Sequence, residues 1–140
     1  MQDRAMHQPT YPESFNDATI KQWIQDYYTA VDVDGAVETI ADFFTPDAVV
    51  QMGEHGVSDR PGLIQLFTST WDYVASRSHH VVSIDPLGNN TFLARGAVTY
   101  NLKDGRSVTP EWGGIMKLVQ QAGEWKMSYY KVYFAAFPAF

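Results

Sequence analysis

The spacing of apolar residues changes halfway along the chain. In the N-terminal half, apolar residues recur every three to four positions in three stretches, which predicts three helices. The first begins near Asp17, with Asp17 and Thr19 as competing N-caps, and its apolar stripe continues to Val31. The second is short, with Asp34 as its expected N-cap, and the third begins near Asp59.

In the C-terminal half, the apolar positions alternate with polar ones, as in strands that bury one face. Extended segments are predicted over 78–85, 91–102, 107–120 and 124–134, with one short strand earlier, over 48–52. Helices followed by a run of strands favour an α+β fold, here three helices and then a four-strand meander plus the short strand. Residues 1–16 are polar and interrupted by prolines, so we expect a flexible N-terminal arm followed by a single domain over 17–140.

Composition narrows the class of protein. A chain of 140 residues with 45% hydrophobic residues can form one domain. Its net charge of -6 argues against a nucleic-acid partner, which needs a basic face. The absence of cysteine excludes disulfides and thiol nucleophiles and fits a reducing, cytoplasmic location. No apolar run reaches the roughly 18 residues of a membrane span, so no membrane association is expected.

Several common catalytic motifs are missing from the sequence. It has no His-Glu-x-x-His pair, no phosphate-binding glycine loop and no Gly-x-Ser-x-Gly turn. The adjacent His79 and His80 point to opposite faces of a strand and cannot chelate one metal ion together. We therefore expect acid–base chemistry without a metal or an organic cofactor.

Two segments carry a family resemblance: DYYTAVDVDGAVETIADFFTPDAVV near the start and GEWKMSYYKVYF near the end. Together with the order of elements, they resemble the nuclear transport factor 2-like superfamily, and within it the SnoaL-like and scytalone dehydratase-like branch, over about 17–134. The resemblance implies a cone-shaped, curved mixed sheet wrapped around a long N-terminal helix, with a mostly apolar pocket at the open end. The superfamily contains dehydratases, isomerases, cyclases, epoxide hydrolases and proteins without activity, so the fold does not settle the function.

His80 is the first candidate catalytic residue. Alternation along 78–85 groups it with Ser78, Val82 and Ile84 on the more apolar face, and leaves His79 on the outer face. The resemblance implies that a histidine of this strand points into the cavity, and this histidine is catalytic in scytalone dehydratases. An imidazole there could take a proton from a carbon next to a carbonyl or give one to a leaving hydroxyl. The alternative is a core histidine bonded to a backbone carbonyl.

Asp32 and Tyr28 follow from the end of the first helix. Asp32 resembles the aspartate that orients the catalytic histidine in scytalone dehydratases; alternatively, it only ends one helix or caps the next. Tyr28, or Tyr27, matches the helix-1 tyrosine of ketosteroid isomerases and could donate a hydrogen bond to a substrate oxygen, although a helical tyrosine can equally serve packing.

Glu111 and Glu54 are candidate acids. Glu111 lies between Pro110 and Trp112, where desolvation would raise its pKa and make it a general acid; alternatively, it is an outward charge that discourages edge pairing. Glu54 follows the short strand at the expected pocket rim. The other pocket residues of dehydratases and isomerases do not carry over, since their positions fall near Gly96, Gly114 and Met52.

Aromatic residues of the sheet suit a flat or polycyclic ligand. The expected substrate-binding residues are Trp112, Tyr100, Tyr130, Met52, Glu54 and Trp23. The apolar tail over 134–140 must be covered by the pocket mouth, a partner subunit or another hydrophobic surface.

The leading hypothesis is a cofactor-independent enzyme of secondary metabolism: a dehydratase, isomerase or polyketide-type cyclase, hence a lyase or isomerase. It would act on an apolar, oxygenated, polyketide- or terpenoid-like metabolite, with His80, Asp32, Tyr28 and Glu111 as catalytic residues. The alternatives are a non-catalytic binding module for a hydrophobic small molecule and a dimerisation domain of the same fold. A homodimer through the outer sheet face is expected from the resemblance.

Overall fold

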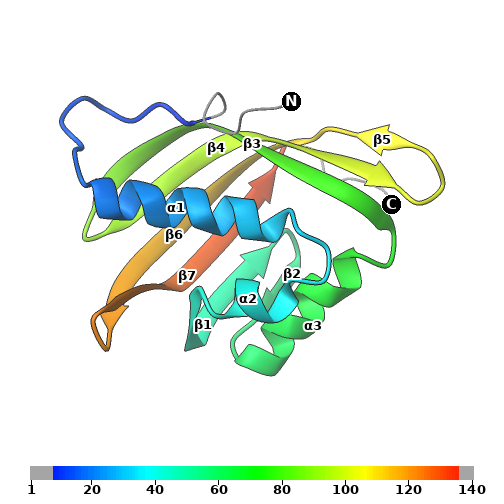
Figure 1. The fold of residues 1–140 in the computed structure, drawn as a ribbon, viewed down its shortest axis with the longest axis horizontal. Helices are drawn as coiled ribbons and strands as arrows, with labels where there is room; N and C mark the ends of the chain where they lie inside the picture. Colours follow the sequence, from blue (N-terminus) through cyan, green and yellow to red (C-terminus); the bar gives the residue numbers. More distant parts are fainter. Residues whose placement is uncertain (1–7, 136–140) are drawn as a thin grey trace.

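The computed structural model describes residues 8–135, which form three helices and one mixed sheet of seven strands (Figure 1). The elements are α1 (Ala18–Val31), α2 (Val37–Ala41), β1 (Phe44–Met52), β2 (His55–Val57), α3 (Arg60–Thr70), β3 (Val74–Gly88), β4 (Thr91–Leu102), β5 (Ser107–Val108), β6 (Glu111–Gln121) and β7 (Glu124–Phe134). The predicted α+β class is confirmed.

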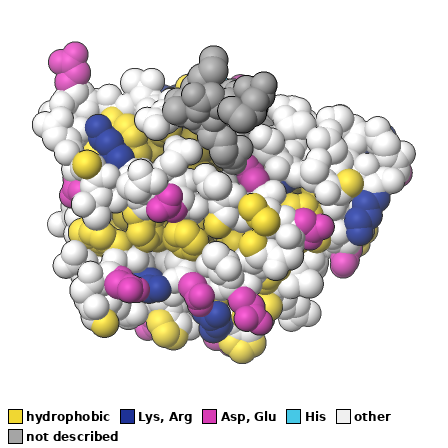
Figure 2. All heavy atoms as spheres, viewed as in Figure 1, with side chains coloured by type: hydrophobic (Ala, Val, Ile, Leu, Met, Phe, Trp, Pro, Cys, Tyr) yellow, Lys and Arg dark blue, Asp and Glu magenta, His cyan; other side chains and the backbone are white. Residues whose placement is uncertain are grey.

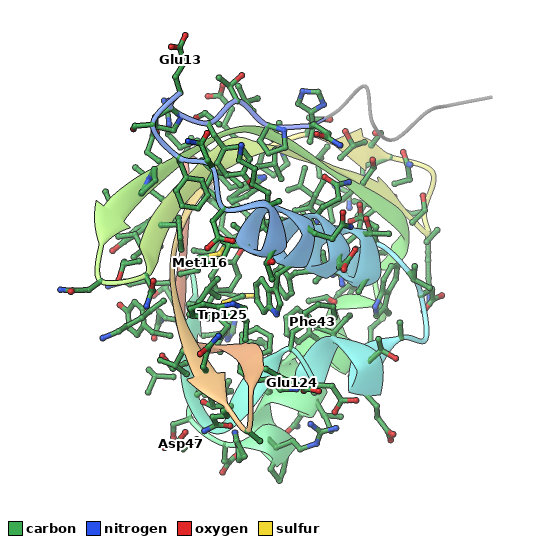
Figure 3. All side chains as sticks on the ribbon, turned by 60° about the vertical axis from the view of Figure 1, so that its left-hand side comes forward. Glu13, Phe43, Asp47, Met116, Glu124 and Trp125 are labelled. Atoms are coloured by element: carbon green, nitrogen blue, oxygen red, sulfur yellow. The ribbon has the colours of Figure 1, made fainter. Side chains whose placement is uncertain are left out.

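The sheet curves around α1. Its strand order is β2-β1-β7-β6-β4-β3, with β5 beside β4, and of these strand pairings only that of β1 with β7 is parallel. Figure 3 shows the curved sheet with α1 on its concave side and Met116 between the two. This is the expected cone around the first helix.

The helix starts are set by aspartate side chains. The Asp17 carboxylate accepts a hydrogen bond from the Ile20 backbone N–H at 3.1 Å, so Asp17 rather than Thr19 caps α1. Asp59 caps α3 in the same way through the N–H of Gly62 at 2.8 Å. The prediction for Asp34 was wrong: α2 begins later and has no side-chain cap, because Gly35 turns the chain with a positive φ of 84°.

Several strand boundaries differ from the prediction: β1 begins at Phe44 rather than at 48, and β3 spans Val74–Gly88 rather than 78–85. The predicted strand over 107–120 is divided into β5 and β6 around Pro110, which has no N–H to donate to a neighbouring strand. The segment after β1 contains a further short strand, β2, which pairs back onto β1. This hairpin brings residue His55 to the open end of the cone.

The core lies between α1 and the concave face of the sheet. The apolar stripe of α1 is buried there through Ile20, Ile24, Tyr27 and Val31. Each fully buried aliphatic side chain of this kind contributes about 1.5–3 kcal/mol. The first helix is therefore the central element against which the site is built.

Residues 8–16 of the predicted arm lie against the domain. Thr10 forms a parallel bridge to Ser83, donating its N–H to the carbonyl of Val82 at 2.9 Å. Tyr11 and Phe15 pack on the core. The rest of the arm and the apolar tail after residue 135 lie outside the described residues.

The surface carries mixed charges. On the face shown in Figure 2, the Lys and Arg side chains are scattered among acidic ones, without a basic patch. Among the described residues, no helix is long and apolar enough to span a membrane.

Candidate active site

A β-bulge in β3 decides which histidine faces the concave side. In the pairing of β3 with β4, His79 lies opposite Val98 and Val81 lies opposite Gly96. The next residue of β4, Arg95, lies opposite Ser83, so Val82 has no partner in β4. One extra residue on β3 therefore separates Val81 from Ser83, and the alternation of faces reverses there.

His79, not His80, is consequently the inward histidine. Arg77 and Val81 are buried on the inner face before the bulge, and Ile84 is buried after it. His79 shares the face of Arg77 and Val81, whereas His80 is exposed. The prediction that His80 lies in the concave face was wrong, because it extended the alternation from Ile84 across the bulge.

The Asp32 carboxylate holds His79 by two hydrogen bonds. Its Oδ1 lies 2.7 Å from the ring Nδ1 of His79, and its Oδ2 accepts the His79 backbone N–H at 2.9 Å. The side chains are only 9% and 16% exposed for Asp32 and His79. Because an ionised carboxylate only accepts, the ring donates through Nδ1–H and leaves the Nε2 lone pair as an available base. The expected carboxylate–imidazole pair is thus present, with His79 in place of His80.

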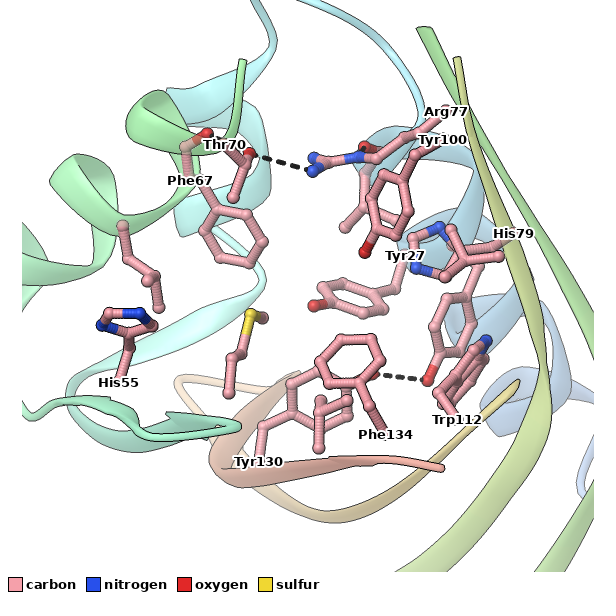
Figure 4. Close-up of a pocket in the computed structure, with 16 residues that line it drawn as sticks. Tyr27, His55, Phe67, Thr70, Arg77, His79, Tyr100, Trp112, Tyr130 and Phe134 are labelled. Carbon is pink, nitrogen blue, oxygen red and sulfur yellow. Dashed lines mark hydrogen bonds between the residues drawn. The ribbon is translucent and has the colours of Figure 1, made fainter. Parts of the chain in front are cut away.

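His79 borders a mostly apolar cavity of about 100 Å³ (Figure 4). One water needs roughly 10–15 Å³ of such space, so the cavity has room for a small organic group. It is lined from α1, α3 and most of the strands by Tyr27, Tyr28, Val31, Met52, His55, Leu66, Phe67, Thr70, Arg77, His79, Val98, Tyr100, Trp112, Tyr130, Val132 and Phe134. The His79 ring centroid lies 5.6 Å from that of Tyr28 and 5.8 Å from that of Trp112.

Two phenols close the cavity next to His79. The hydroxyls of Tyr28 and Tyr130 are 2.8 Å apart and share one hydrogen bond. Burial raises the pKa of both tyrosines well above the ordinary value, so both stay neutral. Only one of their two protons is needed for the mutual bond, which leaves the other to donate to a ligand oxygen.

Arg77 is a buried pocket residue that the sequence reasoning missed. It is 7% exposed, and its Nε and Nη1 donate to the carbonyl of Val31 at 2.6 Å and to Thr70 Oγ1 at 3.0 Å. Burial lowers the pKa of the guanidinium, and nearby Tyr100 and Asp32 partly offset this effect. Its position two residues before His79 is the signal that could have found it, since residues i and i+2 of a strand share a face.

The remaining predicted site residues divide into two groups. Tyr28, predicted as a catalytic residue, lines the cavity. So do four of the predicted substrate-binding residues: Met52, Tyr100, Trp112 and Tyr130. The other three predicted residues do not line it. Glu54 lies in an exposed turn, and its neighbour His55 lines the cavity in its place, across from His79 in Figure 4.

Glu111 and Trp23 are placed away from the cavity. Glu111 is exposed on the outer face, because it precedes the buried Trp112 and successive strand residues alternate. Trp23 packs beside Phe43 near the start of β7 and donates its indole N–H to the carbonyl of Trp125 at 3.0 Å. A general-acid role for Glu111 and a substrate contact for Trp23 do not fit this geometry. Within residues 8–135, no group of three or more candidate ligands could hold a metal ion.

Comparisons with solved structures agree with this architecture. A candidate aromatic ring hydroxylase from Novosphingobium aromaticivorans superposes with a TM-score of 0.73 at 24% identity, over 84% of this chain and 87% of that chain. A candidate scytalone dehydratase from the same species gives 0.72 at 17% identity, over 84% and 82%. A hexachlorocyclohexane dehydrochlorinase, LinA type 2, gives 0.70 at 18% identity, over 86% of each chain. At these identities, the likeness shows the fold.

The curved sheet around α1 and the cavity between them define the nuclear transport factor 2-like fold. Residues 14–131 match the model of the SnoaL-like domain, and the chain belongs to this family. Comparison with curated protein sequences gives no significant match.

Proposed function

We propose that the cavity is the active site of an acid–base enzyme of the lyase or isomerase class that needs no cofactor. The observation that carries this proposal is the Asp32–His79 pair at the wall of an apolar cavity. A buried carboxylate that fixes the ring through Nδ1 favours the imidazole as a base at Nε2 and stabilises the imidazolium that forms.

The reaction begins with proton transfer from carbon. His79 Nε2 takes a proton from a carbon next to a carbonyl, and the electron pair moves toward the carbonyl oxygen. The free phenol proton of the Tyr28–Tyr130 pair stabilises the negative charge that develops on that oxygen. The imidazolium then returns the proton, either to a departing hydroxyl, which completes a dehydration, or to another carbon, which completes an isomerisation.

The lining and the neighbours support an apolar, oxygenated substrate. Aromatic and aliphatic side chains make up most of the cavity wall, which suits a ring system of the polyketide or terpenoid type. Two of the similar structures carry names that denote eliminations, a dehydratase and a dehydrochlorinase. Both reactions are consistent with a base placed as His79 is.

The adjacent histidines provide a matched test. Cyclic ketones and hydroxyketones would be incubated with the protein in D₂O, and proton exchange next to the carbonyl and loss of water would be followed by NMR. His79→Gln is expected to lower the rate by about 10²–10⁴-fold, the usual contribution of a positioned base. His80→Gln, which changes an exposed residue on the opposite face, is expected to leave the rate within about twofold of the wild type.

Equal rates in the two variants would contradict His79 as the base. Wild-type rates no faster than buffer, with the bound ketone recovered unchanged, would instead support the binding-module alternative. Because the His79→Gln variant loses its bond to Asp32, circular dichroism would establish that it is folded before the rates are compared.

A further inference from the structure

The charges around the cavity are unbalanced on its inner surface. Its described lining contains one arginine and two histidines, but no aspartate or glutamate. Asp32 does not line the cavity, and both of its carboxylate oxygens form hydrogen bonds with His79. Because His79 acts as a neutral base, the described lining carries one permanent positive charge, in a protein of net charge -6.

The source of this charge is Arg77. None of the ion pairs among residues 8–135 includes it. Its Nη2 is buried and has no hydrogen-bond partner among the described residues, and the guanidinium carbon lies 4.5 Å from the Trp71 ring centroid. In Figure 4 its side chain forms the cavity wall beside Tyr100.

Apart from its contact with the Trp71 ring, the structural contacts of Arg77 do not require a positive charge. Arg77 bonds two neutral acceptors, the Val31 carbonyl and Thr70 Oγ1, which a neutral amide could also satisfy. Burying a cation without a direct anionic partner is costly, and the cost is recovered when an anion is bound nearby.

We infer that the substrate is an acid whose ionised oxygen, most simply a ring-bound carboxylate, is attracted to the Arg77 wall of the cavity while a neighbouring C–H faces His79. This inference rests on the proposed function and names its substrate class. Arg77 and His79 are two residues apart on the same face of β3, about 7 Å along the strand, so one small acid spans both. The cation also stabilises the further negative charge that proton removal creates.

The test compares two probes of nearly equal shape. Benzoate and benzamide differ in charge, and their affinities for the wild-type protein would be measured by isothermal titration calorimetry. Benzoate is expected to bind about 10–100-fold more tightly, the factor that corresponds to one charge-assisted interaction. Equal affinities, tighter binding of benzamide, or no benzoate binding at low millimolar concentration would overturn the inference.

Variants then assign the preference to Arg77. Arg77→Met is expected to abolish the preference for benzoate, whereas Arg95→Met, which removes an exposed arginine of β4, is expected to retain it. A benzoate preference kept in folded Arg77→Met would overturn the assignment, and the wild-type comparison remains decisive if that variant does not fold.

His79→Gln separates this inference from the proposed function. A benzoate preference that persists in His79→Gln supports the acidic-substrate inference whatever happens to turnover, because the probe does not react. Conversely, loss of turnover in that variant supports the base even if the wild type shows no preference between the probes.

Discussion

Gly96 is the position at which the bulge in β3 can be tested directly. It pairs with Val81 at the bulge, and a Cβ built on it would lie 2.0 Å from the backbone carbonyl oxygen of His80. Ordinary contact begins at 3.4 Å, so Gly96→Ala forces a shift of about 1.4 Å in the backbone at the His80–Val81 peptide.

The cost of this shift is large because the obstacle is backbone and not a flexible side chain. Overpacking of this kind costs about 1–3 kcal/mol, and we expect Gly96→Ala at the upper end. For a domain of this size, about 3 kcal/mol corresponds to a fall of roughly 10 °C in the unfolding temperature. The change also moves the segment that directs His79 into the cavity.

Gly113→Ala is the matched control on the neighbouring strand. Its added Cβ would lie 3.8 Å from the carbonyl oxygen of Ala94, an ordinary contact. Since alanine loses less conformational entropy than glycine on folding, we expect this variant to be neutral or slightly more stable. Thermal unfolding followed by circular dichroism compares the two. If Gly96→Ala is as stable as Gly113→Ala, the close approach between β3 and β4 is wrong.

Three further predictions concern the buried polar groups. Asp32→Asn, which weakens two hydrogen bonds to His79, is expected to lower the free energy of unfolding by about 1.5–3 kcal/mol in urea titrations. An unchanged free energy of unfolding would show that the Asp32–His79 pair does not contribute to stability. The raised pKa values of Tyr28 and Tyr130 keep their protons on the folded protein when the unfolded chain releases them. The contribution of these two tyrosines to stability is therefore constant below about pH 10 and falls above it by about 1.4 kcal/mol per pH unit for each tyrosine. An unfolding temperature that does not change with pH in alkali would contradict this. Tyr28→Phe removes the hydrogen bond between the two hydroxyls and is expected to slow turnover, while the hydrogen bonds between Asp32 and His79 are kept. An unchanged rate would exclude the phenol pair from binding the substrate oxygen.

Much of the fold follows from local signals in the sequence. The stripe of α1, the start of α3 near Asp59 and the strands β4 and β7 were predicted with boundaries close to those observed, because caps, turns and alternation are properties of neighbouring residues. The family resemblance also predicted that Asp32 orients a histidine of this strand, although the residue named was His80 and the partner in the structure is His79.

The choice of histidine depends on contacts between distant residues. The bulge arises where β3 pairs with β4 around Gly96, and nothing in the segment from 78 to 85 alone marks the extra residue. The burial of Arg77 likewise depends on the helix ends at Val31 and Thr70, which only the tertiary structure brings to β3. Local alternation therefore gave the right strand but the wrong face.

Asp32 links the fold to the chemistry of the site. Strand β3 is at the edge of the sheet, where backbone N–H groups lack a neighbouring strand, and the Asp32 Oδ2 accepts one of them from His79. The same carboxylate holds the His79 ring through Oδ1. Because Asp32 directly follows α1, the end of the central helix, the edge of the sheet and the base are fixed relative to one another by one side chain. The ring orientation is thus a consequence of how the first helix meets the sheet, which is why a shift in β3 or the loss of Asp32 should impair stability and chemistry together.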